Sequence, residues 1–232
     1  MSHSGTLYVV ATPIGNLQDI TLRALETLKT VDLVAAEDTR HTARLLTHFG
    51  LQKKTMALHE HNERRAGEQV IRALQSGRNV ALVTDAGTPG ISDPGAVLVD
   101  MAHAAGVTVV PLPGPCAAAT ALSAGGLVQP HFLFYGFLPA AGGQRRNAIE
   151  SLRELAATLV FYEAPHRILD SVADLAELLG PARTIVFARE LTKTFETIHR
   201  TTLGAAAEWL QADANRRRGE FVLLVEGRAP QA

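Results

Sequence analysis

The chain has 232 residues, of which 47% are hydrophobic and 19% charged, with a formal net charge of −1 at pH 7 and a single cysteine, Cys116. This is the composition of a globular protein; it excludes an internal disulfide or a multi-cysteine metal site, and no apolar run approaches the roughly twenty residues of a membrane span. The first residues show neither a basic region nor an apolar stretch of the kind found in secretory signals, so a cytoplasmic location is predicted.

The predicted elements alternate between strands and helices along the whole chain, a pattern typical of βαβ units and a parallel sheet. Strands are predicted over residues 7–11, 31–37, 55–59, 79–85 and 107–112 in the first half, and over 132–137, 158–163, 184–190, 196–202 and 221–226 in the second. Helices of the second half are predicted near residues 145–155, 167–179 and 205–211. No helix is expected between residues 183 and 202, so part of the second sheet should be antiparallel.

The alternating pattern is interrupted at residues 125–130, Gly-Gly-Leu-Val-Gln-Pro. We place a domain boundary there, with an N-terminal domain over residues 1–127 and a C-terminal domain over residues 128–232. The first is predicted to be a doubly wound, mainly parallel α/β sheet, and the second a mixed α/β sheet.

Turn-forming and polar residues follow every strand of the first domain. These segments are residues 11–17, 37–40, 59–62, 85–95 and 113–116. Taken singly, each has a structural explanation as a turn, a helix cap or a strand end. Because ligands of open α/β sheets bind outside the carboxyl ends of the strands, the five segments together predict a binding site at this edge.

The ligand of this edge is not expected to carry a polyphosphate. The chain has no P-loop motif, and the segment after the first strand has one glycine, Gly15, where a Rossmann fingerprint needs three. The segment after the fourth strand carries Asp85 and Asp93 but no lysine or arginine. That balance suits a cationic or neutral ligand, and S-adenosylmethionine, a sulfonium joined to adenosine, fits it.

Three of these segments carry motifs of a known superfamily. Residues 7–21, residues 87–95 (Gly-Thr-Pro-Gly-Ile-Ser-Asp-Pro-Gly) and residues 113–117 (Pro-Gly-Pro-Cys-Ala) resemble the tetrapyrrole (corrin and porphyrin) methylases, which use S-adenosylmethionine. Residues 35–40, 59–62 and 162–167 resemble the branch that 2'-O-methylates a cytidine in the decoding region of 16S ribosomal RNA. The superfamily usually has Gly-Asp-Pro where this chain has Gly87-Thr88-Pro89, which points away from tetrapyrrole substrates.

The resemblance implies two α/β domains with the cofactor in the cleft between them, a homodimer, and 16S ribosomal RNA in the assembled small subunit as partner. It also implies a set of cofactor-facing positions that act mostly through backbone atoms. They are Ile14, Gly87, Thr88, Pro89, Ile91, Ser92, Gly114, Pro115, Cys116, Tyr162 and Glu220.

A ribose hydroxyl loses its proton as it attacks, so a general base is expected nearby. The candidates are Asp38 and His59 first, then Glu37, His61, Glu163, His166 and Glu190. The two histidines could equally be ordinary strand-end residues in hydrogen bonds. A metal site is not expected, because no third ligand has diagnostic spacing.

Residues 40–78 contain eight lysines and arginines against three glutamates. Charge alone favours solvated helix faces, whereas the resemblance favours contacts with RNA phosphates. The candidates for RNA contact are Arg40, Arg44, Arg64 and Arg65. Two other functions stay open: a methylase acting on a corrinoid or porphyrin, and a non-catalytic RNA-binding protein on the same fold.

Overall fold

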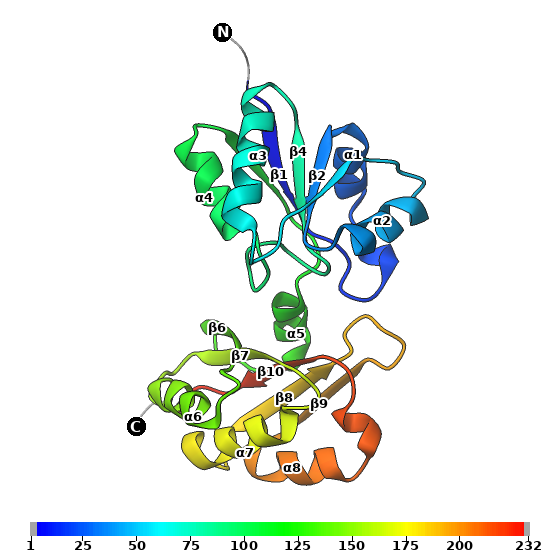
Figure 1. Cartoon of the computed structure of the whole chain (residues 1–232). Helices are drawn as coiled ribbons and strands as arrows, with labels where there is room; N and C mark the ends of the chain where they lie inside the picture. The colour runs from blue at the N-terminus through cyan, green and yellow to red at the C-terminus, as the bar shows by residue number, and fades with distance from the viewer. Residues whose placement is uncertain (1–3, 230–232) are drawn as a thin grey trace. The chain divides into compact units, whose positions relative to one another are not determined.

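The computed structural model describes residues 4–229, and the chain divides after Cys116 into two compact units. Each unit is built around its own sheet (Figure 1). Within the described residues, no helix is both long and apolar enough to cross a membrane.

The first unit holds a five-stranded sheet in the order β3-β2-β4-β1-β5, and every neighbouring pair is parallel. Its strands are β1 (Thr6–Val10), β2 (Leu33–Ala36), β3 (Thr55–Ala57), β4 (Val80–Val83) and β5 (Thr108–Leu112). Its helices are the short η1 (Leu17–Asp19), α1 (Leu22–Thr30), α2 (Thr39–His48), α3 (Glu63–Gln75) and α4 (Ala96–Ala104). The predicted parallel sheet is confirmed.

Helices cover both faces of this first sheet. Along β4, Val80 and Leu82 pack into one apolar cluster with α3 and α4, while Ala81 and Val83 pack into a second cluster with α1 and α2. Successive side chains of a strand point to opposite faces, so a strand buried on both faces has to be apolar throughout. The unbroken apolar runs of β2 and β4 follow from this doubly wound arrangement.

The second unit holds a mixed sheet in the order β6-β7-β10-β8-β9. Its strands are β6 (Phe132–Phe137), β7 (Thr158–Glu163), β8 (Thr184–Arg189), β9 (Thr197–Thr202) and β10 (Phe221–Val225). Its helices are α5 (Ala117–Gly125), α6 (Gly142–Ser151), α7 (Ile168–Leu179), α8 (Leu203–Gln211) and the short η2 (Ala214–Arg217). Strands β6 and β7 are parallel, whereas β10 runs antiparallel to β7 and β8, and β9 antiparallel to β8. The predicted mixed sheet is confirmed.

The division of the chain falls one helix earlier than the sequence-based boundary after Leu127. Helix α5 packs against β10 of the second sheet, and a Cβ atom on Gly125 would lie 2.4 Å from Leu224 Cδ1. The helices α6, α7 and α8 lie on the other face, as Figure 1 shows. Small residues let α5 approach its sheet closely, and this fixes the helix to the second unit.

Candidate functional site

The loops that follow β1, β4 and β5 are joined to one another at the carboxyl edge of the first sheet. Thr12 and Gly87 exchange both backbone hydrogen bonds, with N to O distances of 2.9 and 3.0 Å. The Thr88 hydroxyl donates to the Pro115 carbonyl oxygen at 3.0 Å. We call residues 12–15, 85–92 and 113–116 the cradle. Because three loops share these bonds, the cradle is held as one unit.

Glycine is required at two cradle positions. Gly87 has φ +82°, a conformation that side chains disfavour, and a Cβ atom there would lie 3.4 Å from Ile14 Cγ2. A Cβ atom on Gly114 would lie 2.8 Å from the Cβ atom of Ala11. The backbone conformation therefore favours glycine at position 87, and the close approach to Ala11 leaves no room for a side-chain atom at position 114.

The structure brings together the nine predicted cofactor positions of the first unit. All of them belong to the cradle: Ile14, Gly87, Thr88, Pro89, Ile91, Ser92, Gly114, Pro115 and Cys116. The two remaining positions lie in the second unit. Tyr162 is half-buried on β7, where its hydroxyl oxygen accepts a hydrogen bond from Ala118 N–H at 3.2 Å, and Glu220 is exposed just before β10.

Carboxylates gather where β2 and β4 end. Glu37 Oε2 accepts from Asp85 N–H at 3.2 Å, and Asp85 Oδ1 accepts from Asp38 N–H at 3.1 Å. Burial, followed by repulsion from Glu37 and Asp85, raises the pKa of Asp93 to about 6. Burial also raises the pKa of Glu37 above its ordinary value, against the opposing hydrogen bond from Asp85. This edge of the sheet is consequently electronegative and disfavours anions.

Asp38 is engaged with Arg40. Its Oδ1 accepts from Arg40 N–H at 2.8 Å and caps α2, while the Arg40 guanidinium donates to both carboxylate oxygens at 3.2 and 2.9 Å. The hydrogen bonds from Arg40 hold the pKa of Asp38 far below its usual range. A carboxylate with so low a pKa is a weak proton acceptor near neutral pH.

The turn between β3 and α3 carries His59 and His61. Asn62 holds this turn, since its Oδ1 accepts from His59 N–H at 2.9 Å and its Nδ2 donates to the Ala57 carbonyl at 3.2 Å. His61 lies 3.2 Å from Glu60, between Nε2 and Oε1. Within residues 4–229, the buried Nδ1 atom of His59 has no hydrogen-bond partner, and no three metal-binding side chains form a cluster.

Glu63 is a structural residue of the site that sequence reasoning missed. It is buried, and its Oε1 accepts from the backbone N–H groups of Gly95, Val97 and Leu98 at 2.9, 3.0 and 3.2 Å. These groups begin α4, so Glu63 anchors the far end of the cradle loop from α3. Its position in the sequence indicates an acidic first turn of α3 but gives no sign of this contact.

The predicted base Glu163 is enclosed in the second unit. Its side chain has 0% exposure, and it accepts hydrogen bonds from Ser171 Oγ at 2.5 Å and Ala164 N–H at 2.8 Å. Arg167 pairs with it at 3.3 Å, between Nε and Oε1, and donates to the Leu138 carbonyl. These contacts favour a structural role for Glu163, whereas His166 on the same turn is exposed.

The predicted base Glu190 is also engaged. Its Oε1 accepts from Lys193 Nζ at 2.9 Å and from Glu220 N–H at 2.9 Å. Burial opposes ionisation of Glu190, but the hydrogen bonds from Glu220 and Lys193 outweigh it and lower the pKa below the ordinary value. Of the three predicted bases of the second unit, Glu163 and Glu190 are therefore committed to other protein groups.

The predicted RNA-contacting arginines lie on two helices of the first unit. Arg40 and Arg44 are exposed on α2, and Arg64 and Arg65 are exposed at the start of α3. Arg40 is neutralised by Asp38, as described above. Within the part of the chain that the structure describes, the other three have no carboxylate partner and are available to an anion.

Known proteins match this chain over nearly its whole length. Residues 6–207 match the tetrapyrrole (corrin/porphyrin) methylases as a family. The chain is 56% identical over 227 residues to the ribosomal RNA small subunit methyltransferase I of Escherichia coli O157:H7, covering 98% of this chain and 79% of that protein. It is 55% identical over 225 residues to the protein of the same name from Haemophilus influenzae, covering 97% and 80%.

Two solved structures show the same fold at low sequence identity. The methyltransferase CobJ superposes with a TM-score of 0.71 at 21% identity, covering 99% of this chain and 97% of that one. A uroporphyrin-III-C-methyltransferase from Thermus thermophilus superposes with a TM-score of 0.67 at 20% identity, covering 96% and 94%. These similarities concern the fold alone.

Proposed function

The chain belongs to the tetrapyrrole methylase family and, within it, to the ribosomal RNA small subunit methyltransferase I group, and we infer from this membership that it methylates ribosomal RNA with S-adenosylmethionine. We propose that the acceptor is the 2'-hydroxyl of a cytidine ribose in the decoding region of 16S ribosomal RNA. The observation that carries the proposal is the cradle beside an acidic edge.

The residues present fit S-adenosylmethionine. Gly87 and Gly114 let the loops of the cradle pack against Ile14 and Ala11, which holds their backbone in place for a ligand. The cradle contains Asp85 and no lysine or arginine, while Glu37 and Asp93 lie in the adjoining loops after β2 and β4. This charge balance favours a sulfonium cation over a nucleoside polyphosphate.

S-adenosylmethionine supplies an activated methyl group when it is bound, so the residues of this chain mainly orient the two reactants and exclude water. The fixed loops of the cradle suit that task, because Thr12, Gly87 and Thr88 lock them together. Ile14 closes against Gly87, and Ile91 offers an exposed apolar side chain on the cradle loop. The nine cradle positions are therefore our proposed cofactor residues in the first unit, with Tyr162 and Glu220 proposed on the resemblance.

The proton of the ribose hydroxyl needs an acceptor. We assign this role to His59, because Asn62 fixes its turn and, among the described residues, neither ring nitrogen of its half-buried imidazole has a hydrogen-bond partner. Asp93 is the second candidate, since a pKa of about 6 leaves it ionised but still basic near neutral pH. Asp38 is better suited to orienting Arg40.

Removing the base tests this assignment. His59→Gln is expected to lower kcat by about a hundredfold, which is at the lower end of the effect of losing a general base. The control is His61→Gln, the same change two residues later in the chain, which should alter kcat less than about threefold. An unchanged kcat for His59→Gln would transfer the role to Asp93, whose replacement by Asn should then abolish turnover.

The proposed substrate is the assembled small subunit, and we propose that the protein acts as a homodimer in the cytoplasm. Arg44, Arg64 and Arg65 support RNA binding through their unpaired, exposed side chains on α2 and α3. Each phosphate contact releases counterions and makes the affinity salt-dependent, so we expect binding to weaken steeply between about 50 and 200 mM salt.

The substrate class is tested by label transfer. The purified protein is incubated with radiolabelled S-adenosylmethionine and, in separate reactions, with small subunits from cells lacking the modification, with naked rRNA and with a precorrin. Label in the rRNA of the subunits is expected. Label in the precorrin alone would replace the proposal with a tetrapyrrole methylase, and cofactor binding without turnover on any acceptor would favour the non-catalytic RNA-binding alternative.

A further inference from the structure

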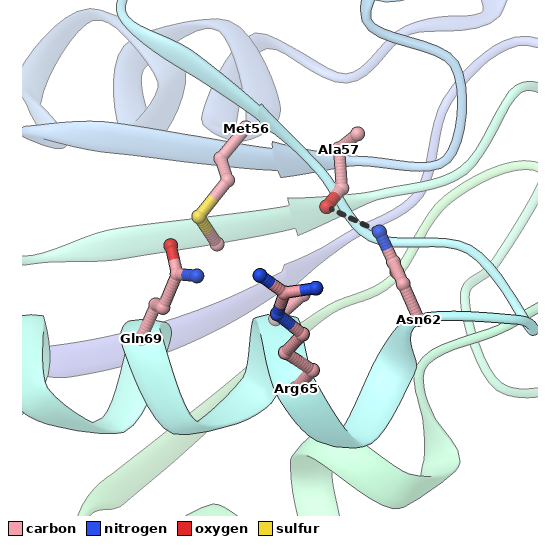
Figure 2. Close-up of a pocket in the computed structure, with 6 residues that line it drawn as sticks. Met56, Ala57, Asn62, Arg65 and Gln69 are labelled. Carbon is pink, nitrogen blue, oxygen red and sulfur yellow. Dashed lines mark hydrogen bonds between the residues drawn. The ribbon is translucent and has the colours of Figure 1, made fainter.

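A pocket of about 280 Å³ opens between the edge strand β3 and helix α3. It is lined by Met56, Ala57, Asn62, Arg65, Ala66 and Gln69. Figure 2 shows the side chains of Arg65 and Gln69 rising from the helix toward the Met56 side chain, which descends from the strand. The pocket thus combines a guanidinium, a carboxamide and an apolar thioether around one space.

Two polar side chains of this pocket, those of Arg65 and Gln69, are not used by the protein itself. Within residues 4–229, the Arg65 guanidinium and the Gln69 carboxamide form no hydrogen bond or ion pair with another residue. Arg40, by contrast, gives its guanidinium to Asp38 at 2.9 Å. The donors of Arg65 and the donor and acceptor of Gln69 are therefore free for a ligand.

The pocket shares a wall with the turn that carries His59. Asn62 lines the pocket, and the same side chain binds the backbone of His59 and of Ala57. Figure 2 shows the bond from Asn62 to the Ala57 carbonyl along the pocket rim. A ligand seated here would contact Asn62, which holds the turn of the residue to which we assign the proton of the ribose hydroxyl.

These groups match the chemistry of a nucleobase. Proteins read single-stranded RNA by stacking splayed bases on flat side chains, including the arginine guanidinium, and by hydrogen-bonding their edges. Met56 adds an apolar, polarisable contact, and Gln69 can both donate to and accept from a base edge. A phosphate would bind Arg65 but would gain nothing from Met56. The combination of Arg65, Gln69 and Met56 therefore favours a base over a phosphate of the RNA backbone alone.

We propose that this pocket binds one unstacked base of the RNA strand that flanks the methylated ribose. The inference rests on the proposed function and assigns part of its substrate specificity to β3 and α3. Its volume lies slightly below the roughly 300 Å³ at which drug-sized sites begin, which accommodates a ligand as small as one base.

Filling the pocket without changing the charge tests the proposal. Gln69→Trp places a large side chain at the pocket, and Gln75→Trp is the matched control on the same helix, exposed and outside the pocket. For Gln69→Trp, KM for small subunits should rise about tenfold, with kcat and the Kd for S-adenosylmethionine unchanged. Gln75→Trp should resemble the wild type, and the isosteric Gln69→Glu should also raise KM.

The results distinguish a failure of the pocket proposal from a failure of the proposed function. If both Gln69 variants bind the cofactor normally and keep the wild-type KM for subunits, the pocket proposal is wrong while the proposed function stands. If the wild type labels no RNA, both are overturned. With 4-thiouridine in the rRNA, a crosslink to the peptide carrying Met56 is expected; crosslinks confined to peptides outside β3 and α3 would contradict a base in the pocket.

Discussion

Glu63 offers the sharpest test of how the cradle is held. Its buried carboxylate receives three backbone N–H groups at the beginning of α4, from Gly95, Val97 and Leu98. The first N–H groups of a helix have no partner inside the helix, so Glu63 supplies what α4 itself lacks. The perturbation is Glu63→Ala, compared with Glu63→Gln.

The expected cost follows from these contacts. Losing a side-chain cap costs about 0.5–2 kcal/mol, and buried hydrogen bonds to a charged group contribute about 1.5–3 kcal/mol. Because one oxygen serves three donors in a buried place, we expect Glu63→Ala to lower the free energy of unfolding by about 3 kcal/mol. Glu63→Gln keeps an acceptor oxygen and loses only the negative charge at the helix N-terminus, so it should lower the free energy of unfolding by about 1 kcal/mol.

Urea unfolding followed by circular dichroism measures both variants, with Glu68→Ala as an exposed control on the same helix. The control should stay within about 0.5 kcal/mol of the wild type. Since Gly95 ends the loop that carries cradle residues 85–92, Glu63→Ala should also raise the Kd for S-adenosylmethionine. Equal costs for Glu63→Ala and Glu68→Ala would refute the reasoning.

Three further changes probe the same structure. The pKa of Asp93 is raised from 3.8 to about 6, so its carboxyl stabilises the fold at pH below about 4 and this contribution is lost as the pH rises through 6. The full shift corresponds to about 3 kcal/mol, and solvent screening of a half-buried group reduces this to about 1 kcal/mol. In urea titrations at pH 8, Asp93→Asn should therefore be more stable than the wild type by about 1 kcal/mol. This gain should vanish near pH 4. Gly114→Ala should cost about 1–3 kcal/mol by thermal unfolding, because its Cβ atom meets Ala11 at 2.8 Å, and Ala11→Gly should restore stability in the double variant. Glu163→Gln should cost about 3 kcal/mol in urea unfolding, because the Arg167 charge loses its carboxylate; a cost below 1 kcal/mol would show that the pair is dispensable.

The sheets were predictable because their strands carry the signal locally. β2 and β4 are apolar at every position, as a parallel strand buried on both faces must be, and β8 and β9 follow each other without room for a helix. Helix α5 was harder to assign to a unit. Its alanine-rich sequence favours a helix but carries no sign that Gly125 contacts Leu224 of the second sheet.

The cradle was predictable from topology, since parallel strands bring their carboxyl ends to one edge. Its electrostatics were not. The pKa of Asp93 depends first on burial and then on Glu37 and Asp85, which approach it only in the folded chain. The pairing of Asp38 with Arg40 is local and could have been suspected from a helix cap followed by arginine. Because of this pairing, Asp38, the first of the predicted bases, orients the Arg40 guanidinium instead.

The most direct test of the central claim is the identity of the methylated atom. Small subunits from cells lacking the modification are incubated with the protein and S-adenosylmethionine, and the rRNA is hydrolysed in alkali and analysed by mass spectrometry. We predict one alkali-resistant dinucleotide that contains 2'-O-methylcytidine and comes from the decoding region. A methyl group on a base, or no methylated rRNA under conditions where the cofactor binds, would contradict the account.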